Sequence, residues 1–190
     1  MATTGYVNAI LPIQPPSGCA RFDAARNAAA ALRGACLDLF ARGEAAVTQT
    51  LLTMAAVEGR GASIKLPHLV GQRLDALASA IDAGGVFAGD GPAAASALAR
   101  FRKHDSLRSD LTHSTFTVTL DQRGHWHLAA RLLALRSRRE ARDVMVTTQE
   151  EASQILSGIE RDFSRLRSTL GQLRQRLRRA GRESTDRLTR

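Results

Sequence analysis

Arg108 and His113 are the residues of this sequence whose types and spacing suggest chemistry. The imidazole of a histidine, with an unperturbed pKa of about 6.5, can take a proton from a ribose 2′-hydroxyl or give one to a leaving 5′-oxygen. The guanidinium of an arginine can neutralise the negative charge that builds up on phosphoryl oxygens. The pair therefore suits cleavage of an RNA phosphodiester without a metal ion.

The two residues lie near the end of a predicted helix, and their spacing alone does not decide their role. Five residues of helix turn through about 500°, so the two side chains do not share one face of an ideal helix. They can converge if the helix ends near Thr112, or if a second chain supplies a second pair. The simpler interpretation is a helix-terminal histidine favoured by the helix dipole, beside a surface arginine. Roughly two such Arg–His matches are expected by chance in a chain of this composition.

Apolar residues recur at spacings of three and four through the first half of the chain, which is typical of amphipathic helices. They predict three helices, over residues 21–42, 44–57 and 66–81. Gly43 is expected to break the first helix from the second, and Pro67 suits the first turn of the third. The Gly-rich residues 83–91 lack the Lys-Ser/Thr pair of a phosphate-binding loop and are predicted to be a connector.

Pro92 is predicted to open a fourth helix that continues to His113, with an offset at His104 and Asp105 that suggests a kink. Alternation of apolar residues then predicts a β-hairpin, with strands over 115–120 and 126–132. Residues 136–143 are charged and are interpreted as a connector.

Thr148 and Glu151 have the spacing of a capping box and predict the start of a long terminal helix. Its apolar seam is expected to be intrachain core, because it is too short for a typical coiled coil. The seam residues are Ile155, Ile159, Phe163, Leu166, Leu170, Leu173 and Leu177. The predicted fold is mainly α: an up-and-down bundle of about five helices, with a β-hairpin inserted between the fourth helix and the long C-terminal helix.

The chain is long enough for one domain, which we assign to residues 18–180. Residues 1–17 contain three prolines and are predicted to be a flexible lead-in, while residues 181–190 are predicted to be a basic, frayed tail. Neither a signal peptide nor a membrane span is indicated. Two cysteines, Cys19 and Cys36, are too few for a disulfide framework, so a cytoplasmic location is the simpler expectation, with Cys36 as a small core residue.

The formal net charge of +9 is concentrated at the C-terminal end. Residues 161–190 carry ten Arg against three acidic residues, which gives +7. Exposed arginines on this helix can bind RNA phosphates, and the candidates are Arg161, Arg165, Arg174 and Arg178. A solvated helix face, or a surface for an acidic protein, is an equally good interpretation.

Around the Arg–His pair the sequence LRSDLTHSTFTVTLDQRGHWHL resembles the HEPN superfamily, whose hallmark is Arg-x4-6-His at the end of an inner helix. Arg108, His113, the apolar Leu111 and the later Trp126 match the pattern. Ser109 occupies a position where Asn or Asp is common. Thr112 and Ser114 replace the usual small residue and glycine, so the backbone after the histidine can differ.

The resemblance implies a homodimer in which two Arg/His pairs form one ribonuclease site, in a toxin or a phage-defence protein, together with a possible cognate inhibitor protein. It makes His113 the acid/base and Arg108 the phosphate stabiliser. By the same resemblance Ser109 or Asp110 is an auxiliary polar group. Apart from the resemblance, His104 is a further auxiliary candidate that can extend the site, although a helix kink explains it equally well. The family also includes members that bind RNA, nucleotides or proteins without cutting, so we keep a non-catalytic binding module and a helical adaptor as alternatives. No cofactor or metal is expected, and His125 with His127 is interpreted as part of an exposed strand.

Overall fold

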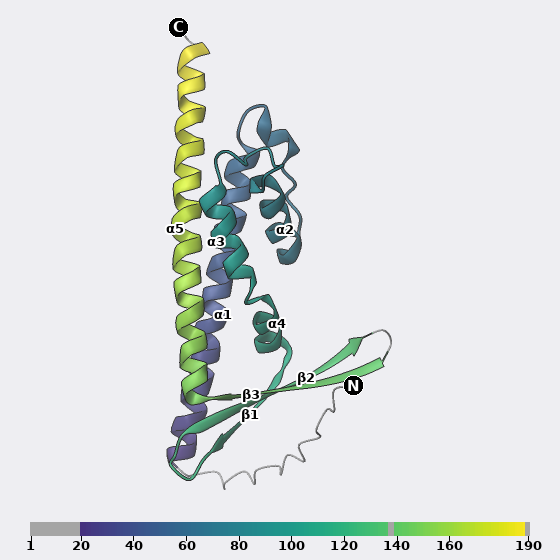
Figure 1. The fold of residues 1–190 in the computed structure, drawn as a ribbon, viewed down its shortest axis with the longest axis vertical. Helices are drawn as coiled ribbons and strands as arrows, with labels where there is room; N and C mark the ends of the chain where they lie inside the picture. The colour runs from purple at the N-terminus through teal and green to yellow at the C-terminus, as the bar shows by residue number, and fades with distance from the viewer. Residues whose placement is uncertain (1–19, 137–138, 189–190) are drawn as a thin grey trace.

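Two long helices, α1 (Ala20–Ala55) and α5 (Gln149–Leu188), lie side by side along the length of the molecule (Figure 1). The computed structural model describes residues 20–136 and 139–188. The predicted lead-in, residues 1–17, and Cys19 lie outside the described residues. The predicted fold class is confirmed: the chain is mainly helical, with a small antiparallel sheet before the C-terminal helix.

The apolar seam of α5 forms the centre of the core. Ile159, Leu166, Leu170 and Leu173 are fully buried. They pack in one cluster with residues of α1 and of the helices between α1 and α5, which confirms that the seam is intrachain core. Burial of each such side chain favours folding by about 1.5–3 kcal/mol. The contact between α5 and α1 is therefore the main source of apolar burial in the bundle.

Gly43 lies inside α1 and does not break it, so the predicted division into two helices is wrong. A Cβ atom at Gly43 would lie 2.5 Å from Cζ of Phe101, closer than real Cβ contacts allow. Glycine is required there because the Phe101 ring packs directly against the backbone of α1. The helix tolerates its low propensity because the flanking sequence is rich in alanine.

The segment after α1 forms a short 3-10 helix, η1 (Arg60–Ser63), and then α2 (Val70–Ile81). Pro67 lies before α2 and not in its first turn, so the predicted start of the third helix is wrong. Leu66 is exposed, and Leu74 and Leu77 form the buried side of α2. The three- and four-residue spacing of apolar residues predicts that Leu66 is buried, but this residue lies before the start of α2, where the spacing of a helix does not apply.

The predicted fourth helix is divided into α3 (Pro92–Arg102) and α4 (Asp105–His113), so the offset at His104 and Asp105 is a break. Pro92 occupies the first turn of α3, as predicted. The Gly-rich connector before it is anchored by Phe87, whose side chain is fully buried. α4 leads directly into the sheet (Figure 1).

The sheet has three antiparallel strands in the order β1 (Thr115–Leu120), β2 (Trp126–Arg136) and β3 (Arg139–Thr148). The β1–β2 hairpin is confirmed, but β3 includes most of the stretch that was predicted to be a charged connector. Leu128 pairs with Val118 on one side and Thr147 on the other, and its side chain faces the bundle. The opposite face is open to solvent and carries exposed apolar side chains: Leu133, Val144 and Val146.

The capping box at the start of α5 is confirmed. The backbone N–H of Thr148 donates to Oε2 of Glu151 at 2.8 Å, and the N–H of Glu151 donates to Oγ1 of Thr148 at 3.2 Å. At its other end α5 continues to Leu188, past residue 181 where the sequence predicts fraying. None of the helices in the described ranges is long and apolar enough to cross a membrane.

Gly43→Ala is expected to destabilise the fold by roughly 1–3 kcal/mol, because the new Cβ overlaps the Phe101 ring. Gly34→Ala, on the same helix, is the matched control: a Cβ there meets nothing within 4 Å, so it should stabilise by up to about 1 kcal/mol. Urea unfolding measures both. Combining Gly43→Ala with Phe101→Leu tests the contact, because the smaller side chain should remove most of the Gly43→Ala penalty; a fully additive double variant would contradict this account.

Candidate functional site

His113 is the last residue of α4, and its side chain is exposed. The helix ends there because Ser114 adopts an extended conformation, with φ −84° and ψ 150°, and its N–H closes the last turn on the carbonyl of Asp110 at 3.0 Å. Within the described part of the chain the imidazole has no hydrogen bond or ion pair. It is therefore free to exchange a proton with a ligand.

Arg108 is directed toward α1. Its Nη1 donates to Oε1 of Glu44 at 3.0 Å, and the two side chains are 37% and 22% exposed. No hydrogen bond joins Arg108 to His113 within the described chain. One protomer thus presents the two predicted catalytic groups as separate features of α4, one held by a carboxylate and one exposed to solvent.

The predicted auxiliary residues occupy different environments. His104 Nε2 lies 3.0 Å from Oδ2 of Asp162 on α5, and both side chains are largely buried. Ser109 is exposed, and Asp110 is half-buried. His104 therefore contributes to the attachment of α4, and Ser109 is the auxiliary residue most open to solvent.

A third contact, which residue spacing does not predict, holds the end of α4. Nε of Arg33 on α1 donates to the carbonyl oxygen of Leu111 at 2.8 Å. The same guanidinium lies over the ring of Phe116, with Cζ 4.4 Å from the ring centroid. Arg33 thus bridges α1 to the two segments that flank His113. Only its place on the same side of α1 as Arg26 was visible in the sequence.

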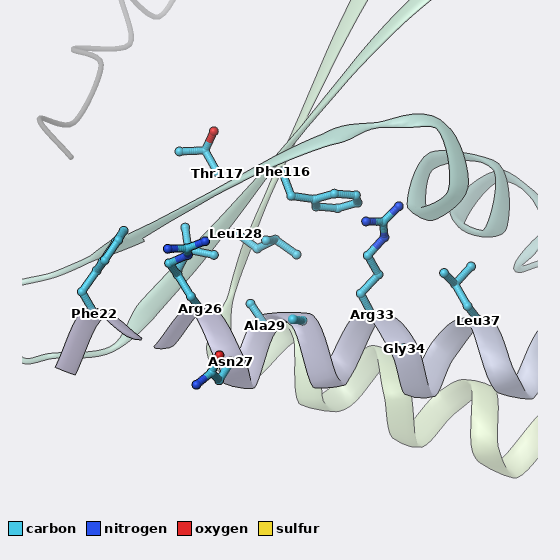
Figure 2. A pocket seen from close by; sticks show the side chains of 12 residues that line it. Phe22, Arg26, Asn27, Ala29, Arg33, Gly34, Leu37, Phe116, Thr117 and Leu128 are labelled. Carbon is cyan, nitrogen blue, oxygen red and sulfur yellow. The ribbon is translucent and has the colours of Figure 1, made fainter. Parts of the chain in front are cut away.

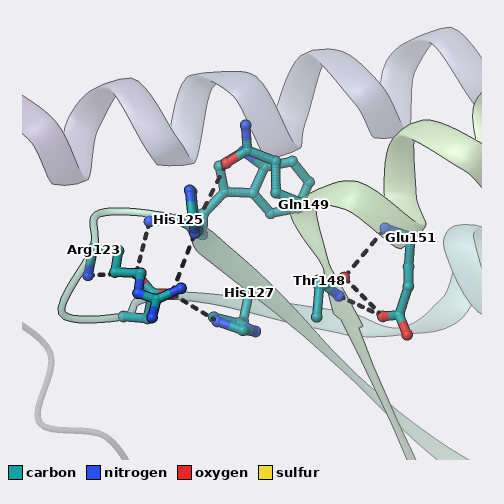
Figure 3. Close-up of polar contacts among 8 residues, drawn as sticks. Arg123, His125, His127, Thr148, Gln149 and Glu151 are labelled. Carbon is teal, nitrogen blue, oxygen red and sulfur yellow. Dashed lines mark hydrogen bonds and ion pairs between the residues drawn. The ribbon is translucent and has the colours of Figure 1, made fainter.

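His125, just before β2, and His127, inside it, lie close to Asp121 in the preceding turn (Figure 3). Asp121 accepts hydrogen bonds from the backbone N–H groups of Arg123 and His125, both at 2.8 Å, and its Oδ2 lies 3.4 Å from Nδ1 of His125. Partial desolvation raises the pKa of Asp121, but these hydrogen bonds and the nearby His125 and His127 lower it further, so the net pKa is below the usual value. Among the described residues no three potential ligands group together as a metal site.

The arginines predicted to bind RNA differ in whether their side chains are exposed to solvent. Arg161, Arg165 and Arg178 are exposed. Arg174 instead packs against α1, where its Nη1 donates to the carbonyl of Ala46 at 3.2 Å and to Oγ1 of Thr50 at 3.0 Å. Burial, with a smaller contribution from Arg178, lowers the pKa of Arg174. Arg174 therefore joins two helices.

Cys36 is fully buried in the core, as predicted. Burial, and to a lesser extent the charge of Glu160, raises the pKa of its thiol to about 11. A thiol with such a pKa carries almost no thiolate at neutral pH, which excludes it as a nucleophile in this state.

The protein-family models contain no match to this chain, and no curated protein or solved structure matches it significantly. The resemblance to the HEPN superfamily therefore depends on the segment around Arg108 and His113.

Arg174→Gln is expected to lower the free energy of unfolding by about 1–2 kcal/mol, because two hydrogen bonds between α5 and α1 are lost. Arg165→Gln removes the same charge from an exposed position of the same helix and should change stability by less than about 0.5 kcal/mol. Chemical denaturation distinguishes the two variants. Equal stabilities would contradict the structural role of Arg174.

Proposed function

We propose that this protein binds RNA through the exposed arginines of α5. The observation that carries the proposal is uncompensated charge. Among the arginines of α5 whose side chains are described, from Arg161 to Arg179, none forms an ion pair with a carboxylate. By contrast, ion pairs with carboxylates are formed on other elements by Arg42, Arg60, Arg102 and Arg108. Charge without a protein counter-ion is available for phosphate groups, which arginine contacts with two parallel N–H donors.

The exposed charges follow the outer side of α5. Arg161, Arg165 and Arg179 are exposed, and spacings of four and fourteen residues keep them close to one side of the helix, opposite the seam. At 1.5 Å per residue these three arginines extend along about 27 Å of the helix. This is a length over which several phosphates of one strand can be contacted at once.

Contacts of this kind are independent of base sequence. No aromatic side chain of α5 is exposed in the described range, since Phe163 belongs to the seam, and base stacking on this surface is not indicated. The proposed binding is therefore electrostatic, weakened by salt and tolerant of sequence. RNA is preferred over an acidic protein as the ligand because the segment at His113 resembles a superfamily that acts on RNA.

Arg161→Gln combined with Arg165→Gln is expected to weaken binding of a fluorescently labelled single-stranded RNA by roughly tenfold at low salt. The slope of log K against log salt should become less steep by about 1.4, because each phosphate contact to a single strand contributes about 0.7. Fluorescence anisotropy at several salt concentrations measures both quantities.

The matched control is Arg123→Gln, which removes an exposed arginine from the β1–β2 turn. Its RNA affinity should stay within about twofold of the wild-type affinity, and its salt slope should differ from the wild-type slope by less than about 0.7. An RNA affinity unchanged in the α5 double variant would contradict the proposal.

A second candidate function, metal-independent cleavage of RNA, is favoured by one observation: the exposed His113 imidazole at the end of α4 has no protein partner within the described chain. It would act as acid or base, with Arg108 of the same or a second copy stabilising the phosphate. The resemblance implies that two Arg108/His113 pairs meet across a dimer interface, and the proposed cleavage site has this arrangement.

His113→Ala is expected to abolish cleavage of a labelled RNA and the appearance of a 2′,3′-cyclic phosphate end, because the proton-transfer group is removed; such groups contribute about 100- to 10,000-fold. Arg108→Ala should reduce cleavage similarly. His68→Ala, at another exposed histidine, is the control that should retain full activity. Cleavage in EDTA that persists in the His113 variant would contradict this function, and RNA binding without cleavage would leave the α5 proposal intact.

A further inference from the structure

A groove of about 630 Å³ lies between α1 and β1, away from the arginines of α5 (Figure 2). Its α1 side carries Arg26, Arg33 and Gly34, and its opposite side includes Phe116. This volume lies within the range of about 300–1,000 Å³ that is typical of small-molecule sites. The groove is therefore large enough to hold a ligand of small-molecule size.

The charge of the groove is positive and uncompensated. Arg26 and Arg33 contribute two guanidinium groups, and no Asp or Glu is among the lining residues. Within the described chain Arg26 has no hydrogen bond or ion pair, and Arg33 uses only Nε, which it donates to Leu111. Each arginine therefore keeps N–H donors for an anion.

The separation of Arg26 and Arg33 along α1 suits a ligand that has an anionic group at one end and a planar ring at the other. Seven residues of helix make nearly two full turns, so Arg26 and Arg33 lie on the same side of α1, about 10.5 Å apart along its axis. The Arg33 guanidinium lies over the Phe116 ring, with Cζ 4.4 Å from the ring centroid, and both side chains line the groove (Figure 2). Nucleic-acid bases stack on guanidinium planes of this kind.

We infer that this groove binds a nucleotide, whose phosphate is held by Arg26 and whose base stacks on Arg33. The nucleotide can be free or can be one unit of a single-stranded RNA, because both present the same phosphate and base. The inference goes beyond the proposed function, since the groove contains none of the α5 arginines. It also gives Arg33 a second role besides its bond to α4.

Isothermal titration calorimetry with the full chain tests the site, using adenosine 5′-monophosphate, inorganic phosphate and a short oligoadenylate as probes. Adenosine monophosphate is expected to bind at least tenfold more tightly than phosphate, because stacking adds to the charge contact. Binding of the mononucleotide indicates a free nucleotide as the natural ligand. Binding of the oligonucleotide alone indicates a strand.

Two variants locate the binding. Arg26→Gln should weaken it about tenfold, because a charge-assisted hydrogen bond to phosphate is lost. Gly34→Leu should prevent it by filling the groove, and it should not disturb the fold, since a Cβ at Gly34 meets nothing within 4 Å. Arg21→Gln is the matched control on α1: it removes an exposed arginine that does not line the groove and should bind as the wild type does.

The inference is overturned if neither adenosine monophosphate nor the oligonucleotide binds at millimolar concentration. It is also overturned if both groove variants bind like the wild type. Loss of oligonucleotide binding only in the Arg161/Arg165 variant would reject the groove and support the α5 proposal. Loss only in the groove variants would do the reverse. Circular dichroism of each variant confirms that the fold is kept.

Discussion

The packing of α5 against α1 is the constraint on which the rest of the structure depends. The two helices share one apolar cluster, and the fully buried Leu166, Leu170 and Leu173 belong to it. α3 joins the same cluster through Phe101, whose ring rests on the backbone at Gly43. This close approach holds the last turn of α3 against α1, and α4 begins three residues after Arg102. The end of α4 is held in turn by the hydrogen bond from Arg33 on α1 to the Leu111 carbonyl.

The arginines of this chain fall into two structural groups. Some connect elements: Arg33 reaches the Leu111 carbonyl, Arg174 the Ala46 carbonyl and Arg176 the Asp90 carbonyl. Each supplies a donor to a backbone acceptor on another element. Others, such as Arg26 and Arg165, have no partner within the described chain. A high arginine content is therefore not by itself a sign of nucleic-acid binding, and the unpartnered residues carry the functional argument.

Local periodicity predicted most of the helices and the first hairpin, because burial of one face imposes a repeat on the sequence. It failed where tertiary contacts decide. Gly43 has low helix propensity, and only the Phe101 ring explains its place inside α1. The sequence did not predict β3, because its first half is charged and resembles a connector. Alternation is visible only in its second half, where Val146 faces outward and Thr147 faces inward. For the site, the place of His113 at a helix end followed from the pattern, whereas its exposure and the Glu44 partner of Arg108 require coordinates.

The ion pair between Arg108 and Glu44 bears directly on whether α4 can act on a phosphate. Both side chains are partly exposed, and pairs of this kind stabilise a fold by only about 0.2–1 kcal/mol, because water solvates the separated charges well. A phosphate offers the guanidinium a bidentate contact that is stronger than a single bond to a carboxylate. A phosphate that replaces Glu44 as the partner of Arg108 would leave the Glu44 carboxylate to be solvated by water, and the ion pair that is lost is a weak one. The carboxylate orients Arg108 in the free protein and does not remove it from the chemistry that the sequence suggests.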